Sequence, residues 1–187
     1  MKIIVGITGA SGSIYGLRLI EVLKEMGHQV HAVLTDSGEQ VVKYECSDIY
    51  ERILGSVDML HDVHNIGASI ASGSFRADAM VVVPASMKTV ASIASGVTDN
   101  LLTRAADVML KEGRKLVLVP RETPMHQGHL ENMLKAAQIG AIIIPACPGF
   151  YHKPTTIMDL VDMLVGKICD HLGIENQLFN RWDGDMK

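Results

Sequence analysis

Three closely spaced glycines near the N-terminus could bring the backbone against an anionic ligand. Gly6, Gly9 and Gly12 lie in the segment VGITGASGSIYG, which follows an apolar run and opens a helical pattern. Glycine tolerates positive φ and close approach of a ligand, and the N-terminus of a helix offers unpaired amides to an anion. The spacing is G-x-x-G-x-x-G rather than the dinucleotide fingerprint G-x-G-x-x-G. The loop favours a nucleotide-type ligand, with a purely structural turn as the alternative.

A second loop of the same kind follows a later apolar run. The segment Pro84-Ala-Ser-Met-Lys-Thr89 offers the hydroxyls of Ser86 and Thr89 and the start of a helix. Ligands of open α/β sheets lie beyond the carboxyl ends of the strands, so the two loops together favour a binding site more strongly than either alone. The alternative is a helix start capped by serine or threonine. Asp36, after another run, could bond a ribose hydroxyl or cap the next helix.

Basic side chains are placed where they could hold a phosphate. Arg104 and Lys111 are seven residues apart on one expected helix and therefore share a face, for which a solvated charged surface is the alternative. Arg121 and Glu122 directly follow the apolar run VLVP, and the end of a buried strand is the usual place for a site residue. Glu122 could orient a basic side chain or move a proton.

The histidines and cysteines do not indicate metal or thiol chemistry. His61 and His64, and also His126 and His129, are each three residues apart, but no cysteine or carboxylate completes a familiar zinc spacing. Cys147 lies near two prolines and has no adjacent histidine or activating motif. We therefore expect neither a functional metal nor a nucleophilic cysteine.

Alternating apolar runs and helical patterns must position these residues. Runs of β-branched residues without polar alternation predict parallel strands covered on both faces, over 3–7, 30–34, 80–83, 116–119 and 141–144. Helical spacing predicts helices before Gly27, over 100–112 with Asp99 as N-cap, and over 156–172. A shorter helical stretch covers 37–45. The predicted fold class is α/β, a single Rossmann-like or flavodoxin-like doubly wound parallel sheet with helices on both faces.

Composition and charge exclude several classes of protein. The 187 residues suit one α/β domain, and 48% apolar with 20% charged residues exclude a disordered chain. With 17 basic and 21 acidic residues, a net charge of -4 and no polybasic run, we expect no nucleic-acid partner. Three scattered cysteines, a start unlike a signal peptide and no long apolar segment predict a cytoplasmic protein with no membrane partner.

Three segments are expected to lie outside the regular elements. Residues 46–78 form a long crossover with weak periodicity, and residues 146–155 read as a loop. Loops of this length in a compact domain are more often functional than idle. A polar tail begins at about 174 and carries the lone Trp182, which we expect to dock on the protein.

Five motifs together resemble one enzyme family. TGASG, SMKT, DNLLTRAADVMLKEGRKLVLVPRETP, HLENML and PGFY are similar to motifs of the UbiX/Pad1 family of flavin prenyltransferases. The resemblance extends from Gly6 to Trp182, and the long block ending in RETP is its most specific part. The chain departs from the family in having PASM for PCSM and PGFY for PAFY, and Gly149 loosens the loop before Tyr151.

The resemblance implies a fold, a reaction and partners. It implies one flavoprotein domain over 1–187 with a tail from about 174, in a Rossmann-like subunit of a homo-dodecamer. Sites at the subunit interfaces would bind FMN and dimethylallyl monophosphate and need no metal. Joining the dimethylallyl group to N5 and C6 of reduced FMN would give prenylated FMN, the cofactor of UbiD-type decarboxylases.

The resemblance also assigns roles to individual residues. The FMN contacts would be Gly9, Ala10, Ser11, Ser37, Ser86, Met87, Lys88, Thr89 and Arg121. The groups around the reacting centre would be Ser11, Glu45, Arg104, Lys111 and Glu122. The dimethylallyl phosphate would contact Tyr151 and Lys167, with Trp182 matching the RW motif near the C-terminus.

The chemistry of these residues agrees with that reaction. An allylic monophosphate ionises when cations and hydrogen-bond donors stabilise the leaving phosphate, and no aspartate-rich magnesium motif is present. Glu45, Glu122 or the released phosphate could then accept the C6 proton. The alternatives are a flavin-dependent decarboxylase of the phosphopantothenoylcysteine type, whose PxMNxxM motif is missing here, and a non-catalytic flavin carrier or NAD-binding module.

Overall fold

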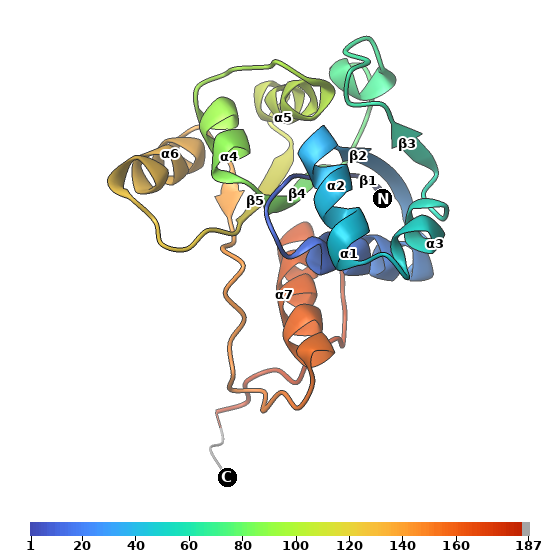
Figure 1. Ribbon diagram of the computed structural model, residues 1–187, viewed down its shortest axis with the longest axis vertical. Coiled ribbons are helices and arrows are strands. Elements are labelled where there is room, and N and C mark those ends of the chain that lie inside the picture. The colour runs from blue at the N-terminus through green and yellow to red at the C-terminus, as the bar shows by residue number, and fades with distance from the viewer. Residues whose placement is uncertain (185–187) are drawn as a thin grey trace.

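A computed structural model describes residues 1–184 and shows one six-stranded parallel sheet (Figure 1). The strands are β1 (Lys2–Ile7), β2 (Gln29–Leu34), β3 (Met59–His61), β4 (Ala79–Ala85), β5 (Lys115–Pro120) and β6 (Ile142–Ile143). Their order is β3-β2-β1-β4-β5-β6, and every neighbouring pair is parallel. This is the Rossmann strand order, so it decides between the two expected topologies and confirms the predicted fold class.

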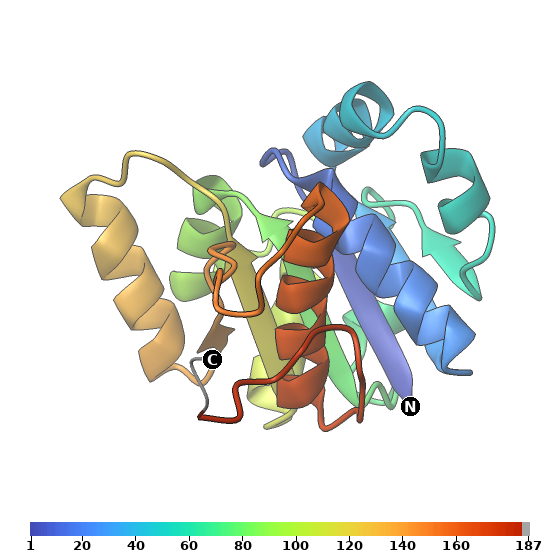
Figure 2. The ribbon, with the colours of Figure 1, turned by 90° about the horizontal axis from the view of Figure 1, so that it is seen from below.

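Helices connect the strands and cover both faces of the sheet. They are α1 (Ser13–Glu25), α2 (Asp36–Glu45), α3 (Tyr50–Leu54), α4 (Met87–Ala94), α5 (Leu101–Lys111), α6 (Gln127–Gln138) and α7 (Ile157–Leu172), with a 3-10 turn over Ser69–Ala71. Figure 1 shows α4 and α5 on one side of the sheet and α1 and α7 on the other. In Figure 2, α1 and α7 cross the near face and α6 lies at the margin of the molecule.

Two hydrophobic cores result from the alternation of side chains along the strands. Val5 and Val81 point to the face that α1 and α7 cover, whereas Ile4 and Met80 point to the face covered by α4 and α5. All four side chains are buried, which explains the lack of polar alternation in the strand sequences. The sheet is therefore a rigid central layer whose strand ends can hold a site.

Several sequence expectations need correction. The crossover over 46–78 contains α3 and the edge strand β3, and β3 has no apolar run because two of its three residues are exposed. The predicted strand over 141–144 has only two paired residues. Asn100, rather than Asp99, caps α5, because its side chain accepts from the amide of Thr103. Within residues 1–184, no helix has both the length and the apolar character needed to cross a membrane.

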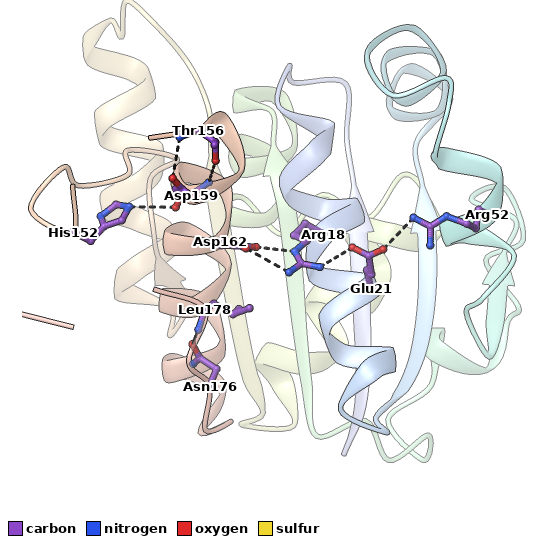
Figure 3. Close-up of polar contacts among 9 residues, drawn as sticks. All are labelled: Arg18, Glu21, Arg52, His152, Thr156, Asp159, Asp162, Asn176 and Leu178. Carbon is purple, nitrogen blue, oxygen red and sulfur yellow. Dashed lines mark hydrogen bonds and ion pairs between the residues drawn. The ribbon is translucent and has the colours of Figure 1, made fainter. Parts of the chain in front are cut away.

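A line of ion pairs joins α3, α1 and α7 on one face. Arg18 donates to Asp162 of α7 at 2.7 Å and to Glu21 at 2.7 Å, and Arg52 of α3 donates to Glu21 at 3.1 Å (Figure 3). The side chains of Arg18 and Asp162 are only about one-fifth exposed, so solvent screens this ion pair less than it would screen a fully exposed one. These contacts fix the helix α7 that carries the tail and Lys167.

Candidate active site at the sheet switch point

The two glycine- and serine-containing loops lie side by side at the carboxyl edge of the sheet. Strands β1 and β4 are neighbours although β2 and β3 lie between them in the chain, so the strand order reverses here. Thr8 ties the loops together, since its hydroxyl donates to Pro84 O at 2.7 Å and accepts from Ser86 N at 2.7 Å. Ligands of this fold bind at such a switch point, and Thr8 is a residue that sequence reasoning missed.

Glu45 occupies the N-terminus of α1. Its Oε2 accepts from the amides of Gly12 and Ser13, each at 2.9 Å, and Gly12 has a φ of 100°. The expectation that these amides are unpaired and wait for a ligand anion is therefore wrong. Glu45 is exposed to solvent at the C-terminal end of α2, and its contact with the positive N-terminus of α1 offsets the unfavourable dipole of its own helix.

The ionisation of Glu45 follows from these contacts. Burial alone would raise the pKa of Glu45, but hydrogen bonds from the Ser11 hydroxyl and from the amides of Ser13 and Gly12 outweigh it. The pKa of Glu45 is therefore lowered, and the side chain is a carboxylate at neutral pH.

Arg121 reaches the same loop from β5. Its Nε donates to the carbonyl of Ser11 at 3.0 Å, which crosses from one side of the switch point to the other. Glu122 turns back to its own backbone, where its Oε1 accepts from the amide of Thr123. The predicted pair thus separates, with Arg121 at the glycine loop and Glu122 beside it on the exposed side of the chain.

A cavity of about 300 Å³ lies beside these loops and collects the hydroxyls predicted for FMN. Most of its lining residues have polar side chains, and the full set comprises Thr35, Asp36, Ser37, Val63, His64, Ser86, Lys88, Thr89, Ser92, Asp99, Asn100 and Thr103. Ser86 caps α4 by accepting from Thr89 N, as the alternative interpretation expected. Met87 is buried in the core. Ser86 therefore both caps α4 and lines the cavity, so the two interpretations of this loop are compatible.

Helix α2 begins at this cavity in a way that the sequence did not reveal. Thr35, not Asp36, is its N-cap, with the hydroxyl accepting from Gly38 N at 3.0 Å and lying 3.2 Å from Ser37 Oγ. Asp36 instead contacts His64 Nε2 at 3.0 Å across the cavity mouth. A Cβ at Gly9 would lie 2.5 Å from Ser37 Oγ, so glycine is needed there for the two loops to meet.

The residues predicted to hold the allylic phosphate lie elsewhere on the chain. Arg104 donates to Ala71 O and to Asp107, and Lys111 pairs with Glu112. Lys111 ends α5 just before β5 begins, which places it at the amino edge of the sheet, opposite the cavity. Within one chain the structure does not bring Arg104 or Lys111 to the cavity.

Tyr151, Lys167 and Trp182 form a third location around the tail. The rings of Tyr151 and Trp182 meet edge to face at 6.2 Å, and Lys167 lies 3.8 Å from Asp170. The predicted docking of the tail is confirmed by this ring contact. Like Arg104 and Lys111, these residues do not line the 300 Å³ cavity.

The histidines have local partners. His61 Nε2 lies 3.0 Å from His31 Nδ1, and the rings of His126 and His129 stand 3.6 Å apart. Across residues 1–184, no three His, Cys, Asp or Glu side chains gather as metal ligands do. Although His61 and His64 are three residues apart, they do not share a helix face, because His61 ends β3.

Comparison with known proteins identifies the family. The Flavoprotein family profile matches residues 1–170. The flavin prenyltransferase UbiX of Alkalihalophilus pseudofirmus is 51% identical over 188 residues, which cover 95% of this chain and 94% of that protein. The chain belongs to the UbiX family of flavin prenyltransferases.

Solved structures of UbiX-family proteins have the same fold as this chain. The crystal structure of AnUbiX (PadA1) in complex with FMN and dimethylallyl pyrophosphate is 43% identical, has a TM-score of 0.95 and covers 98% of this chain and 97% of its own. A dodecameric FMN-dependent UbiX-like decarboxylase from Escherichia coli O157:H7 has the same identity and TM-score and covers 98% and 100%. The peptidyl-cysteine decarboxylase EpiD, at 19% identity and a TM-score of 0.65, shares the fold alone.

Proposed function

We propose that this chain joins the dimethylallyl group of dimethylallyl monophosphate to N5 and C6 of reduced FMN. It is an enzyme of the transferase class, and its cofactor is FMN. The observation that carries the proposal is the pairing of the loops after β1 and β4 at the switch point of a UbiX-family fold. The alternatives of a cysteine decarboxylase and of a flavin carrier are not favoured, because the relatives that share 45–51% identity are flavin prenyltransferases.

The chain's own residues fit FMN at this edge. Hydroxyls of Ser37, Ser86 and Thr89 and the ammonium of Lys88 surround a cavity that suits the polar part of a mononucleotide. Gly9 and Ala10 give close approach of the backbone, and the Ser11 hydroxyl would lie near the flavin N5 edge. Arg121 would complete the contacts beside Ser11. FMN supplies the nucleophilic ring atoms when it is bound.

Cationic residues would stabilise the leaving phosphate. As the allylic carbon–oxygen bond breaks, its electron pair leaves with the phosphate, and Arg104, Lys111, Lys167 and the hydroxyl of Tyr151 would stabilise that charge. Glu45, Glu122 or the released phosphate would then accept the C6 proton. Because the pKa of Glu45 is lowered, Glu45 is ionised and has room to accept a proton, and its hydrogen bond from the Ser11 hydroxyl also holds Ser11 in place.

Within one chain, the proposed phosphate-binding residues lie apart from the cavity, which supports a site formed between subunits. We propose that a neighbouring subunit of a homo-oligomer, by resemblance a dodecamer, brings the cations and the tail to the FMN loops. We further propose one domain over 1–187 with a tail from about 174, a cytoplasmic location, and transfer of the prenylated FMN to a UbiD-type decarboxylase.

An anaerobic incubation tests the function. The protein is incubated with reduced FMN and either dimethylallyl monophosphate or dimethylallyl pyrophosphate, and the flavin is analysed by mass spectrometry. We expect noncovalent FMN binding at micromolar concentration and prenylated FMN with the monophosphate. FMN binding without consumption of either allylic substrate would show a carrier and would overturn the proposal.

A further inference from the structure

One carboxylate of α7 fastens the tail to the body of the protein. Arg181 donates to both oxygens of Asp170, with Nη1 at 2.9 Å from Oδ2 and Nη2 at 2.6 Å from Oδ1. Asn176 Nδ2 adds a third hydrogen bond to Oδ1 at 3.0 Å, and Figure 3 shows Asn176 lying against α7. Bidentate arginine–carboxylate contacts are the strong, directional kind of ion pair, so Arg181 dominates the environment of Asp170.

Lys167 is the loosely held partner of the same carboxylate. Its Nζ lies 3.8 Å from Asp170 Oδ2, outside hydrogen-bond distance, and the side chain is 44% exposed. Hydrogen bonds from Arg181, more than any other contact, hold the pKa of Asp170 below its usual range. Asp170 is thus an anion one turn from Lys167, and Arg181 satisfies the oxygens that would otherwise attract the lysine.

Arg181 also stands between Asp170 and the aromatic part of the tail. Its guanidinium lies 5.2 Å from the centre of the Phe179 ring. The next residue, Trp182, meets the ring of Tyr151 edge to face at 6.2 Å. Arg181 is thus linked to both residues assigned to the allylic phosphate, to Lys167 through Asp170 and to Tyr151 through its chain neighbour Trp182.

We infer that Arg181 is a positioning residue for the allylic phosphate, because it saturates Asp170 and so leaves the Lys167 ammonium free to bind substrate. Arg181 acts through Asp170 and does not itself touch the phosphate. The inference rests on the proposed function. It adds the reason why Lys167 stays available for the phosphate although Asp170 lies next to it. Without Arg181, Asp170 would draw Lys167 from its present 3.8 Å into a close, hydrogen-bonded ion pair.

Substitutions at both ends of the ion pair test this. In Arg181→Gln, we expect the KM for dimethylallyl monophosphate to rise about three- to fivefold, the upper end for one partly exposed ionic contact, with kcat and FMN affinity unchanged. Adding Asp170→Asn should restore the KM to within about twofold of wild type, because no carboxylate remains to capture Lys167. Arg181→Lys should retain most of the affinity. Arg52→Gln, which removes a remote arginine–carboxylate pair, serves as the matched control.

Binding is measured separately from turnover by equilibrium dialysis of the monophosphate against the FMN-loaded enzyme. A double variant as weak as Arg181→Gln would show that the arginine merely anchors the tail, and would overturn the inference. Asp170→Asn alone provides a further test, since it should bind at least as tightly as wild type, and weaker binding also contradicts the inference. Absence of product from the wild-type enzyme would instead refute the proposed function.

Discussion

Glu45 is the residue whose surroundings differ most from what its sequence neighbours suggest. It ends α2 in a polar stretch, yet its carboxylate lies on the amides of Gly12 and Ser13, 33 and 32 residues away along the chain. No local pattern predicts such a contact, because it depends on how α2 packs beside α1. The resemblance to the family placed Glu45 near the reacting centre, and the structure supplies the physical contact that holds it at the glycine loop.

Replacing Glu45 tests its role in the reaction. In Glu45→Gln, we expect FMN affinity to stay within about threefold of wild type and product formation to slow by roughly 10²-fold, the range for losing a general acid–base group. The amide still accepts from Gly12 and Ser13, so the loop keeps its shape. Anaerobic stopped-flow absorbance follows the step directly. A wild-type rate with FMN bound would leave Glu122 or the phosphate as the proton acceptor.

The His31–His61 pair makes stability depend on pH. His31 is 7% exposed, its Nδ1 contacts His61, and its Nε2 is buried without a partner among the described residues. Burial, with the positive neighbours His61 and Lys2, lowers the pKa of His31, and burial lowers that of His61. The unfolded chain therefore binds more protons, so unfolding free energy is fully present above about pH 6.5 and falls as pH drops below it.

Urea unfolding at pH 7.5 and 5.5 measures this dependence. We expect the midpoint to be lower at pH 5.5 in the wild type, and the difference to shrink in His31→Phe and in His61→Gln. The exposed His171→Gln serves as control and should keep the wild-type difference. An unchanged pH difference in both variants of the pair would assign the effect to other groups.

At the scale of elements, the sequence predicted what local pattern encodes and missed what packing decides. The strands with buried β-branched runs were found to within one or two residues, and Thr156 marks the start of α7 because its capping box is local. Strand β3 was missed because Met59 and Leu60 are exposed at a sheet edge and form no apolar run. Helix α6 was missed although Leu130, Met133 and Leu134 recur at helical spacing, and within one chain Ala136 is its only buried residue.

One glycine sets how closely α1 approaches the sheet. A Cβ at Gly16 would lie 2.4 Å from the carbonyl oxygen of Val83 in β4, too close for the backbones to keep their positions. We expect Gly16→Ala to destabilise the protein by about 1–3 kcal/mol, the usual cost of overpacking. Thermal unfolding should register this as a drop of about 2–4 °C per kcal/mol. Gly128→Ala in the exposed helix α6 is the control, with an expected change of under about 1 kcal/mol.

At the scale of the whole molecule, one chain brings only some of the predicted site residues together. The two loops proposed to bind FMN lie at one edge, as the switch-point rule predicts, whereas Lys111 lies near the opposite edge and Tyr151 outside the helices and strands. Sequence alone could not reveal this separation, because seven-residue spacing on α5 says which face Lys111 shares with Arg104 but not how far it lies from the glycine loop. Proximity in an oligomer is a property of the assembly and not of the chain.

Exposed leucines on α6 provide a test of assembly. Leu130 and Leu134 are 53% and 60% exposed and lie one helical turn apart on a helix at the margin of the subunit (Figure 2). We expect Leu134→Glu to lower the mass measured by light scattering and to reduce product formation with it, because a charge cannot be buried there without a partner. Lys135→Glu on the same helix should leave both unchanged. A wild-type protein that is a stable monomer near 20.3 kDa would contradict the oligomer.

The carboxylate of Glu45 on the α1 amides has a consequence for selectivity in the cell. Dinucleotide-binding proteins of this strand order place a pyrophosphate at that helix N-terminus. Here the chain itself fills the position, and a tethered group acts at an effective concentration on the order of millimolar. Free NAD or ATP would have to expel this built-in competitor before using the same amides. A phosphate group from the nucleotide pool would therefore compete with Glu45 for the amides of Gly12 and Ser13 before any flavin binds.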